Sequence, residues 1–137
     1  MREIKFRAWN RKDKKMIYKA EGDCHSSQTY GVDLEGKVLD LFDTAYYPSI
    51  ADAPDFELMQ FTGLTDKNGK PIYEGDIVQV INGSEGNQVA SVAWDEDYFG
   101  WALKRGSFGN GWRLYQWRHD ESMKVIGNIW ENEDPLK

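Results

Sequence analysis

The chain of 137 residues has room for one ordinary domain, or for a small barrel joined to an N-terminal subdomain, and little for two independent functional domains. A hydrophobic fraction of 40% is ordinary, but an aromatic fraction of 14% favours β-structure, because large flat side chains suit pleated surfaces. The net charge of −6 argues against a basic protein, and Cys24, the single cysteine, excludes an internal disulfide. No apolar run approaches the ~18 residues of a membrane helix, and no apolar signal segment opens the chain, so we expect a cytoplasmic protein without membrane contact.

The N-terminal segment is basic although the chain is acidic. Its first 19 residues carry eight basic and two acidic groups, a balance of +6, so the remainder sums to −12. Alternation from Ile4 to Ala8 predicts a half-buried strand with Ile4, Phe6 and Ala8 on the buried face. A polar turn at 10–14 and a returning strand at 16–18 complete a hairpin.

This hairpin has two interpretations. The one we favour is a solvated hairpin whose charges protect an exposed sheet edge. The alternative is a nucleic-acid-binding arm, in which basic side chains contact phosphates and an aromatic ring stacks on a base. The residues of that alternative site are Arg2, Lys5, Arg7, Trp9, Arg11, Lys12, Lys14 and Lys15.

The middle of the chain has weaker signals. Residues 20–29 have turn composition and no periodicity, which predicts a loop. Two β-prone runs, 30–34 and 37–42, flank Glu35-Gly36 and predict a second hairpin, although helical spacing also fits the second run. Residues 45–56, with two prolines, indicate a surface connection with a short helical turn near Ile50, and a strand is expected at 57–61.

The C-terminal half has regularly spaced strand signals. Asn68-Gly69 is the strongest tight-turn dipeptide, because both residues tolerate positive φ. Strands are expected at 77–81, 89–94, 99–104, 112–117 and 123–130, with a helical turn near 118–122. Short strands joined by Gly-rich or acidic turns predict a small curved barrel. The expected fold is mainly β (α+β), with an N-terminal hairpin subdomain at 1–60 packed on a barrel at 61–137.

Five segments together resemble the YopX family of bacteriophage and prophage proteins. They are MREIKFRAW (1–9), KKMIY (14–18), LMQFTGLTDKNGK (58–70), YEGDIV (73–78) and VIGNIWEN (125–132). The resemblance runs from end to end of the chain. It implies a phage or prophage origin and an SH3-like barrel in the C-terminal part, and it implies no activity, because none is established for the family.

Two acidic motifs have metal-binding and structural interpretations. Glu74 and Asp76 would share one face of a strand and could hold a divalent cation in a metal-dependent hydrolase, but Gly75-Asp76 is typical of a turn that enters a strand. Asp66 opens a segment similar to the start of a calcium loop, but no acid stands at the bidentate position. We therefore expect a strand-opening turn and a hairpin tip, and no metal or cofactor.

Catalytic motifs are equally weak. One cysteine and two histidines exclude a zinc site made of Cys and His ligands alone, and Cys24-His25 are neighbours whose side chains diverge on an extended segment, which leaves only the distant His119 as a base. The Gly-rich stretch at 106–111 precedes a predicted strand rather than a helix, so it does not fit a phosphate loop.

Aromatic residues in the predicted barrel are the strongest functional signal. Trp94, Tyr98, Phe99, Trp101, Trp112, Tyr115 and Trp117 lie close in sequence, and a small barrel cannot bury them all. We predict a binding surface formed by Trp94, Trp101, Trp112, Tyr115 and Trp117. Few basic residues accompany these rings, which favours a protein partner or self-association over nucleic acid. The sequence thus predicts a non-enzymatic accessory protein that binds another protein or itself.

Overall fold

The computed structural model describes residues 3–18, 28–44, 47–52, 55–82, 86–105, 112–117 and 123–132. These residues are almost all strand, and their one helical element is the 3₁₀-helix η1 (Leu114–Trp117), so the mainly β prediction is confirmed. Predictions on Cys24, His25, His119, the 106–111 stretch and the turn at 118–122 fall outside the described residues. The chain forms two compact units, residues 6–59 and residues 1–5 with 60–137.

The described residues of the unit 6–59 include two groups of antiparallel strands. Strands β1 (Phe6–Asn10) and β2 (Lys15–Ile17) form the first, with Trp9 opposite Met16. Strands β3 (Gln28–Val32), β4 (Val38–Thr44) and β5 (Tyr47–Asp52) form a three-stranded sheet in that order. Both predicted hairpins are therefore confirmed, and the second run of the second hairpin is a strand.

The expectation for residues 45–56 was wrong in part. Instead of a connection with a helical turn near Ile50, residues 47–52 form strand β5, with Pro48 opposite Asp43 of β4. Because β5 is an edge strand, it tolerates a proline that cannot donate to the ladder. The pairing with β4, rather than local propensity, makes this segment a strand.

The predicted burial of one face at 4–8 was wrong for Ile4 and Phe6 and is confirmed for Ala8. Ile4 and Phe6 are exposed, whereas Arg7, Ala8, Trp9 and Asn10 are all buried. Since consecutive strand residues point to opposite sides, this run shows that both faces of β1 are covered. Arg7 is 3% exposed, so its guanidinium is shielded from water together with its aliphatic stem, and a buried charge of this kind depends on interactions with its neighbours.

The other unit contains the curved sheet. Strand β6 (Phe56–Thr65) starts in the first unit and ends in this one, where it pairs with β7 (Pro71–Tyr73). The following strands are β8 (Asp76–Asn82), β9 (Gly86–Asp95), β10 (Gly100–Lys104), β11 (Trp112–Arg113) and β12 (Met123–Asn128).

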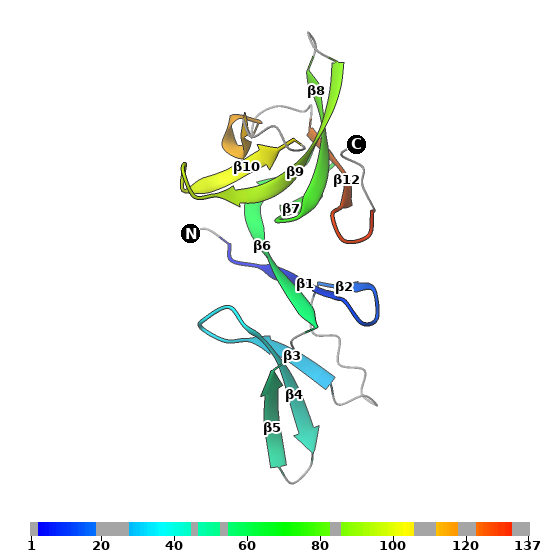
Figure 1. Cartoon of the computed structure of the whole chain (residues 1–137), viewed down its shortest axis with the longest axis vertical. Helices are drawn as coiled ribbons and strands as arrows, with labels where there is room; N and C mark the ends of the chain where they lie inside the picture. Colours follow the sequence, from blue (N-terminus) through cyan, green and yellow to red (C-terminus); the bar gives the residue numbers. More distant parts are fainter. Residues whose placement is uncertain are drawn as a thin grey trace. The chain divides into compact units, whose positions relative to one another are not determined.

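These last five strands form an antiparallel sheet in the order β11-β10-β9-β8-β12, which curls strongly along the long β8–β9 hairpin (Figure 1). A 3₁₀-helix before the last strand and this strand order are the arrangement of an SH3-like barrel. The strand expected at 112–117 is shorter than predicted, because the chain turns into η1 after Arg113.

Alternating side chains of the curved sheet form its core. In β9, Ala90 and Val92 are buried while Ser91 and Ala93 are not, which is the period of a strand with one inner face. Each fully buried aliphatic side chain stabilises the fold by about 1.5–3 kcal/mol. The core consists of Ile72, Val78, Val80, Ala90, Val92, Leu103, Leu114, Met123 and Val125.

The segment that opens the barrel is a structural turn, as we expected. Gly75 has φ +77°, and its N–H donates to the Val92 carbonyl at 2.8 Å. The carboxylate of Asp76, 1% exposed, accepts the Tyr73 N–H at 2.8 Å. These bonds fix the entry into β8 against β9.

Two hairpins share the five-residue pattern Asp-x-x-Gly-Lys, at 33–37 and 66–70. Asp33 and Asp66 each accept backbone N–H groups from the second and fourth residues after them, and Gly36 and Gly69 have φ +81° and +79°. The predicted hairpin tip at Asp66 is thus confirmed. Asp66 also accepts the N–H of Val125 at 3.0 Å, which joins this tip to β12.

Candidate functional site

The alternative metal site at Glu74 and Asp76 lacks geometric support. Glu74 accepts the Gln60 N–H at 3.5 Å, and Asp76 is held by Tyr73, so backbone donors engage both carboxylates. Within the described ranges, no three His, Cys, Asp or Glu side chains gather as metal ligands.

The residues of the alternative nucleic-acid site have different surroundings. Arg7 and Trp9 are buried, and Arg11 forms an ion pair with Glu57. The ammonium of Lys5 lies 2.8 Å from Glu3, and this hydrogen bond raises the pKa of Lys5.

Three lysines of that set are exposed on the β1–β2 turn or next to it: Lys12, Lys14 and Lys15. The turn is built by the buried Asn10, whose side chain accepts the N–H groups of Lys12 and Asp13 at 2.9 and 3.0 Å. Arg2 lies outside the described residues. The assignment stays a prediction, and these three lysines are its accessible part.

A cleft of about 610 Å³ lies in the unit that contains the curved sheet. Exposed aromatic rings dominate its rim: Tyr98 is 55%, Phe99 82% and Tyr115 50% exposed. The volume is that of a ligand-binding cleft rather than of a packing defect. The lining residues are Thr62, Leu64, Asp97, Tyr98, Phe99, Gly100, Trp101, Ala102, Arg113, Leu114 and Tyr115.

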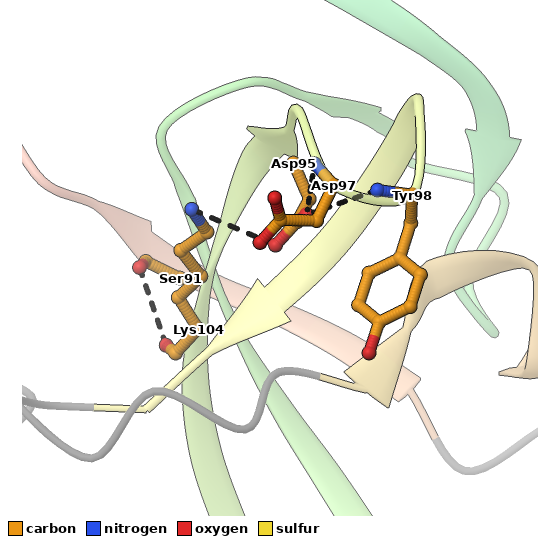
Figure 2. A network of polar contacts seen from close by, with 5 residues as sticks. All are labelled: Ser91, Asp95, Asp97, Tyr98 and Lys104. Atoms are coloured by element: carbon orange, nitrogen blue, oxygen red, sulfur yellow. Dashed lines mark hydrogen bonds and ion pairs between the residues drawn. The ribbon is translucent and has the colours of Figure 1, made fainter.

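The β9–β10 turn positions two of these rings. The carboxylate of Asp95 accepts the N–H groups of Asp97 and Tyr98 at 3.0 and 3.3 Å, and its other oxygen lies 3.8 Å from the ammonium of Lys104 (Figure 2). The turn ends in Phe99, which has φ +48°, a conformation uncommon for residues other than glycine. The turn therefore presents Tyr98 and Phe99 at the rim.

Arg113 connects the two sides of the cleft. Its guanidinium lies 4.5 Å from the centre of the Tyr98 ring and donates to the Tyr115 hydroxyl at 3.3 Å. This hydrogen bond raises the pKa of Arg113, and the guanidinium that lies over the Tyr98 ring is a cation in any case. Arg113 thus positions rings from the β9–β10 turn and from η1.

Trp101 forms part of the cleft wall. It stands opposite Trp94 in the β9–β10 ladder, and the two indoles meet edge to face at 5.3 Å, a pair worth about 1 kcal/mol. Trp101 also packs against the core. Its indole N–H is buried and has no acceptor among the described residues.

The predicted aromatic set is only partly gathered at this cleft. Trp101 and Tyr115 line it, and Trp94, 42% exposed, adjoins it through Trp101. Trp112 is half-buried against the core, and of Trp117 only the backbone, at the end of η1, is described. That this set binds a partner stays a prediction.

Nine of the eleven lining residues lie outside the predicted set, and those with aromatic or charged side chains are Asp97, Tyr98, Phe99 and Arg113. Asp97 was assigned to an acidic turn and Phe99 to a strand. The sequence signal that could have identified the two rings is their position directly after three acidic residues, because side chains next to a cluster of charges are seldom buried. The lining provides four aromatic rings, one cation held by two of them and one carboxylate.

Among the described residues, no helix has the length and apolar character needed to cross a bilayer. Comparison with curated proteins found no match.

The chain resembles several solved structures, and two of them match it over its whole length. Protein EF1440 from Enterococcus faecalis matches with a TM-score of 0.60 and 21% identity, and YopX from Bacillus subtilis matches with a TM-score of 0.60 and 17% identity. In both, the match covers 100% of each chain, and at these identities it establishes the fold alone. The family model described as YopX protein matches residues 5–137. The chain therefore belongs to the YopX family.

Proposed function

We propose that this protein is a non-catalytic phage or prophage accessory module that acts in the bacterial cytoplasm by holding an extended segment of a partner protein in the aromatic cleft. One observation supports the proposal most: Phe99 is 82% exposed and has φ +48°. A left-handed conformation costs an L-residue about 1–2 kcal/mol relative to glycine. Because the Phe99 ring is exposed, its burial offsets little of this cost. A strained, exposed ring at the rim of a cleft has the features of a binding residue.

The neighbouring rings support the same function. Tyr98 and Tyr115 are half exposed, and Arg113 holds both, so the cleft presents a preorganised aromatic surface. Tyrosine and arginine are enriched among the residues that carry binding energy in protein interfaces, because they combine a large contact area with a polar group.

Selection from a displayed library of random peptides tests this function. We expect enriched peptides to bind the wild-type protein and to lose about tenfold in affinity for Phe99→Gly, as expected for a central aromatic contact. Ile81→Ala is the matched control, since Ile81 is 43% exposed in β8 and does not line the cleft. Equal binding to both variants, or no enrichment, would contradict the proposal.

A second function is nucleic-acid binding through Lys12, Lys14 and Lys15, which are exposed at one turn. It predicts binding to oligonucleotides at low salt, with a log–log salt slope near −3 on duplex DNA, since each neutralised phosphate contributes about −0.9. Unchanged affinity after replacement of all three lysines by glutamine would remove this candidate.

A further inference from the structure

We infer that the cleft takes a segment in which one acidic side chain lies next to a large apolar residue, and that Arg113 binds the carboxylate. This inference rests on the proposed function and specifies its ligand. Three features of the described residues support it: a guanidinium with unused donors, aromatic rings beside it, and acidic groups that disfavour a ligand with several negative charges.

Arg113 is the one basic residue among the described residues that line the cleft, and most of its donors are unused. The residue is exposed, and of the N–H groups of its guanidinium one donates to the Tyr115 hydroxyl. Asp97 also lines the cleft, but no carboxylate of a described residue forms an ion pair with Arg113. A carboxylate of the ligand would complete this site.

The guanidinium of Arg113 is positioned before a ligand binds. It lies 4.5 Å from the centre of the Tyr98 ring, and its hydrogen bond to the Tyr115 hydroxyl is 3.3 Å long. An arginine and a carboxylate are both planar, so they form two parallel hydrogen bonds when their planes are aligned. A side chain that is already held loses less conformational entropy on binding than a free one. An acidic side chain therefore suits this position.

The rings beside Arg113 favour an apolar residue next to the acid. Phe99 and Trp101 line the same cleft, and Phe99 is 82% exposed. The indole nitrogen of Trp101 is buried, so this ring offers the ligand a packing surface and no hydrogen bond. An apolar side chain that covers these rings also displaces water around the ion pair, which strengthens it.

The acidic groups near the cleft limit the charge of the ligand. Glu96 and Asp97 are exposed on the β9–β10 turn, and Asp97 lines the cleft. The ammonium of Lys104 pairs with Asp95 and does not line the cleft (Figure 2). The chain also carries a net charge of −6, so a nucleic-acid backbone or a run of acidic residues would be repelled. A single carboxylate at Arg113 fits this charge distribution.

The test selects peptides from the displayed random library against the full chain and then measures defined peptides by calorimetry. The most enriched peptide is synthesised with acetylated and amidated ends, so that its side chains carry its only charges. A second peptide has the acidic residue replaced by its amide, Asp by Asn or Glu by Gln. A third peptide has the same amide and a free C-terminal carboxylate, which separates an internal acid from a chain end.

We expect the enriched peptides to share an acidic residue next to a large apolar one, and both amide peptides to bind about tenfold more weakly. Arg113→Gln should bind the acidic peptide about tenfold more weakly, and Arg113→Lys about threefold, because lysine keeps the charge and loses the planar fork. Asp97→Asn should bind it about twofold more tightly, since a like charge is removed. Ile81→Ala should bind it as the wild type does.

A double-mutant cycle separates direct binding by Arg113 from support of the rings. If Arg113 binds the carboxylate, Arg113→Gln should bind the acidic peptide and its amide with equal affinity. If Arg113 only positions Tyr98 and Tyr115, Arg113→Gln should weaken both peptides and leave the difference between them unchanged, which would overturn the inference.

Other results overturn the inference in distinguishable ways. If selection yields peptides without acidic residues that lose affinity for Phe99→Gly, the ligand class is wrong and the proposed function stands. If selection yields no peptides, both are wrong. Full affinity of the peptide with a free C-terminus makes a chain end the ligand instead of an internal acid. A dimer that Arg113→Gln dissociates in sedimentation makes a second copy the occupant.

Discussion

The turn between β1 and β2 and the turn between β9 and β10 have the same construction in different units. Asn10 and Asp95 end their strands, and each side-chain oxygen accepts the N–H groups of the second and third residues after it. Each turn closes with a left-handed residue, Lys14 at φ +53° and Phe99 at φ +48°.

The two turns differ in the side chains they carry. Residues 11–14 are Arg, Lys, Asp and Lys, whereas residues 96–99 are Glu, Asp, Tyr and Phe. One capping residue and one left-handed residue suffice to form such a turn, which leaves the intervening side chains free for other roles. The second turn adds rings to a cleft, and the first adds charges to a surface.

The Asp33 and Asp66 turns also share their local construction and differ in their surroundings. Both have the Asp-x-x-Gly-Lys pattern and the same local bonds. Asp66 is buried and also bonds to Val125, while the bonds of Asp33 are exposed. Local sequence forms the turn, and its surroundings decide how much the turn contributes to the folded state.

The largest expected effect is the loss of Asp66. Asp66→Ala removes three backbone hydrogen bonds to a buried carboxylate and should lower the free energy of unfolding by about 3 kcal/mol. Asp33→Ala, the matched control, should cost about 1 kcal/mol. Urea unfolding measures the free energy of unfolding of both variants. Equal losses would contradict the claim that the surroundings of Asp66 make its turn contribute more to stability.

Removal of the capping side chains should have the next largest effect. Asn10→Ala removes three hydrogen bonds of a buried carboxamide, two accepted from backbone N–H groups and one donated to the Asp13 carboxylate, and should cost about 2 kcal/mol. Asp95→Ala removes two backbone bonds at a more exposed position and should cost about 1 kcal/mol. Thermal unfolding of the two variants measures how much each capping side chain stabilises its turn. If either variant unfolds at the wild-type temperature, the two capping side chains do not act alike.

The acid dependence of stability should depend in part on Asp66. Burial alone would raise the pKa of Asp66, but hydrogen bonds from Val125, Lys70 and Asn68 outweigh it and lower that pKa below 3.8. A lowered folded-state pKa gives stability that is present above the unfolded-state pKa and is lost as the pH falls through the folded-state value. Asp66→Asn should reduce this loss in urea titrations below about pH 4; an unchanged profile would count against the assignment.

The smallest effect should come from the left-handed residues. Lys14→Gly and Phe99→Gly each relieve backbone strain, and the greater chain entropy of glycine offsets part of the gain, so each should stabilise the fold by about 0.5 kcal/mol. Differential scanning calorimetry checks both. Destabilisation by Phe99→Gly alone would mean that its ring supports the fold.

Much of the fold was predictable from local signals. Asn68-Gly69 and Glu35-Gly36 identified two hairpins, and the regularly spaced strand signals predicted a strand at 89–94, because turns and short strands depend on neighbouring residues. Strand β5 and the covered second face of β1 depend on residues distant in sequence, so local patterns did not reveal them.

The aromatic character of the site was predictable from the sequence, but most of the residues that line it were not. Trp101 and Tyr115 were expected at a binding surface and line the cleft, but Tyr98 and Phe99 were not assigned to it. Their exposure follows from the turn that Asp95 caps and from the positive φ of Phe99, neither of which propensities indicate. Trp112 is half-buried against the core, which depends on the packing of the whole sheet, and its assignment to a binding surface stays a prediction.

The most direct test of a binding role for the β9–β10 turn compares Phe99→Gly with Lys14→Gly, which make the same backbone change in the two turns. The measurement is the affinity of each variant for a peptide selected against the wild-type protein, taken together with its free energy of unfolding. We expect Phe99→Gly to be at least as stable as the wild type and to bind about tenfold more weakly, and Lys14→Gly to bind normally. Wild-type affinity in Phe99→Gly, or an equal loss in both variants, would contradict this role.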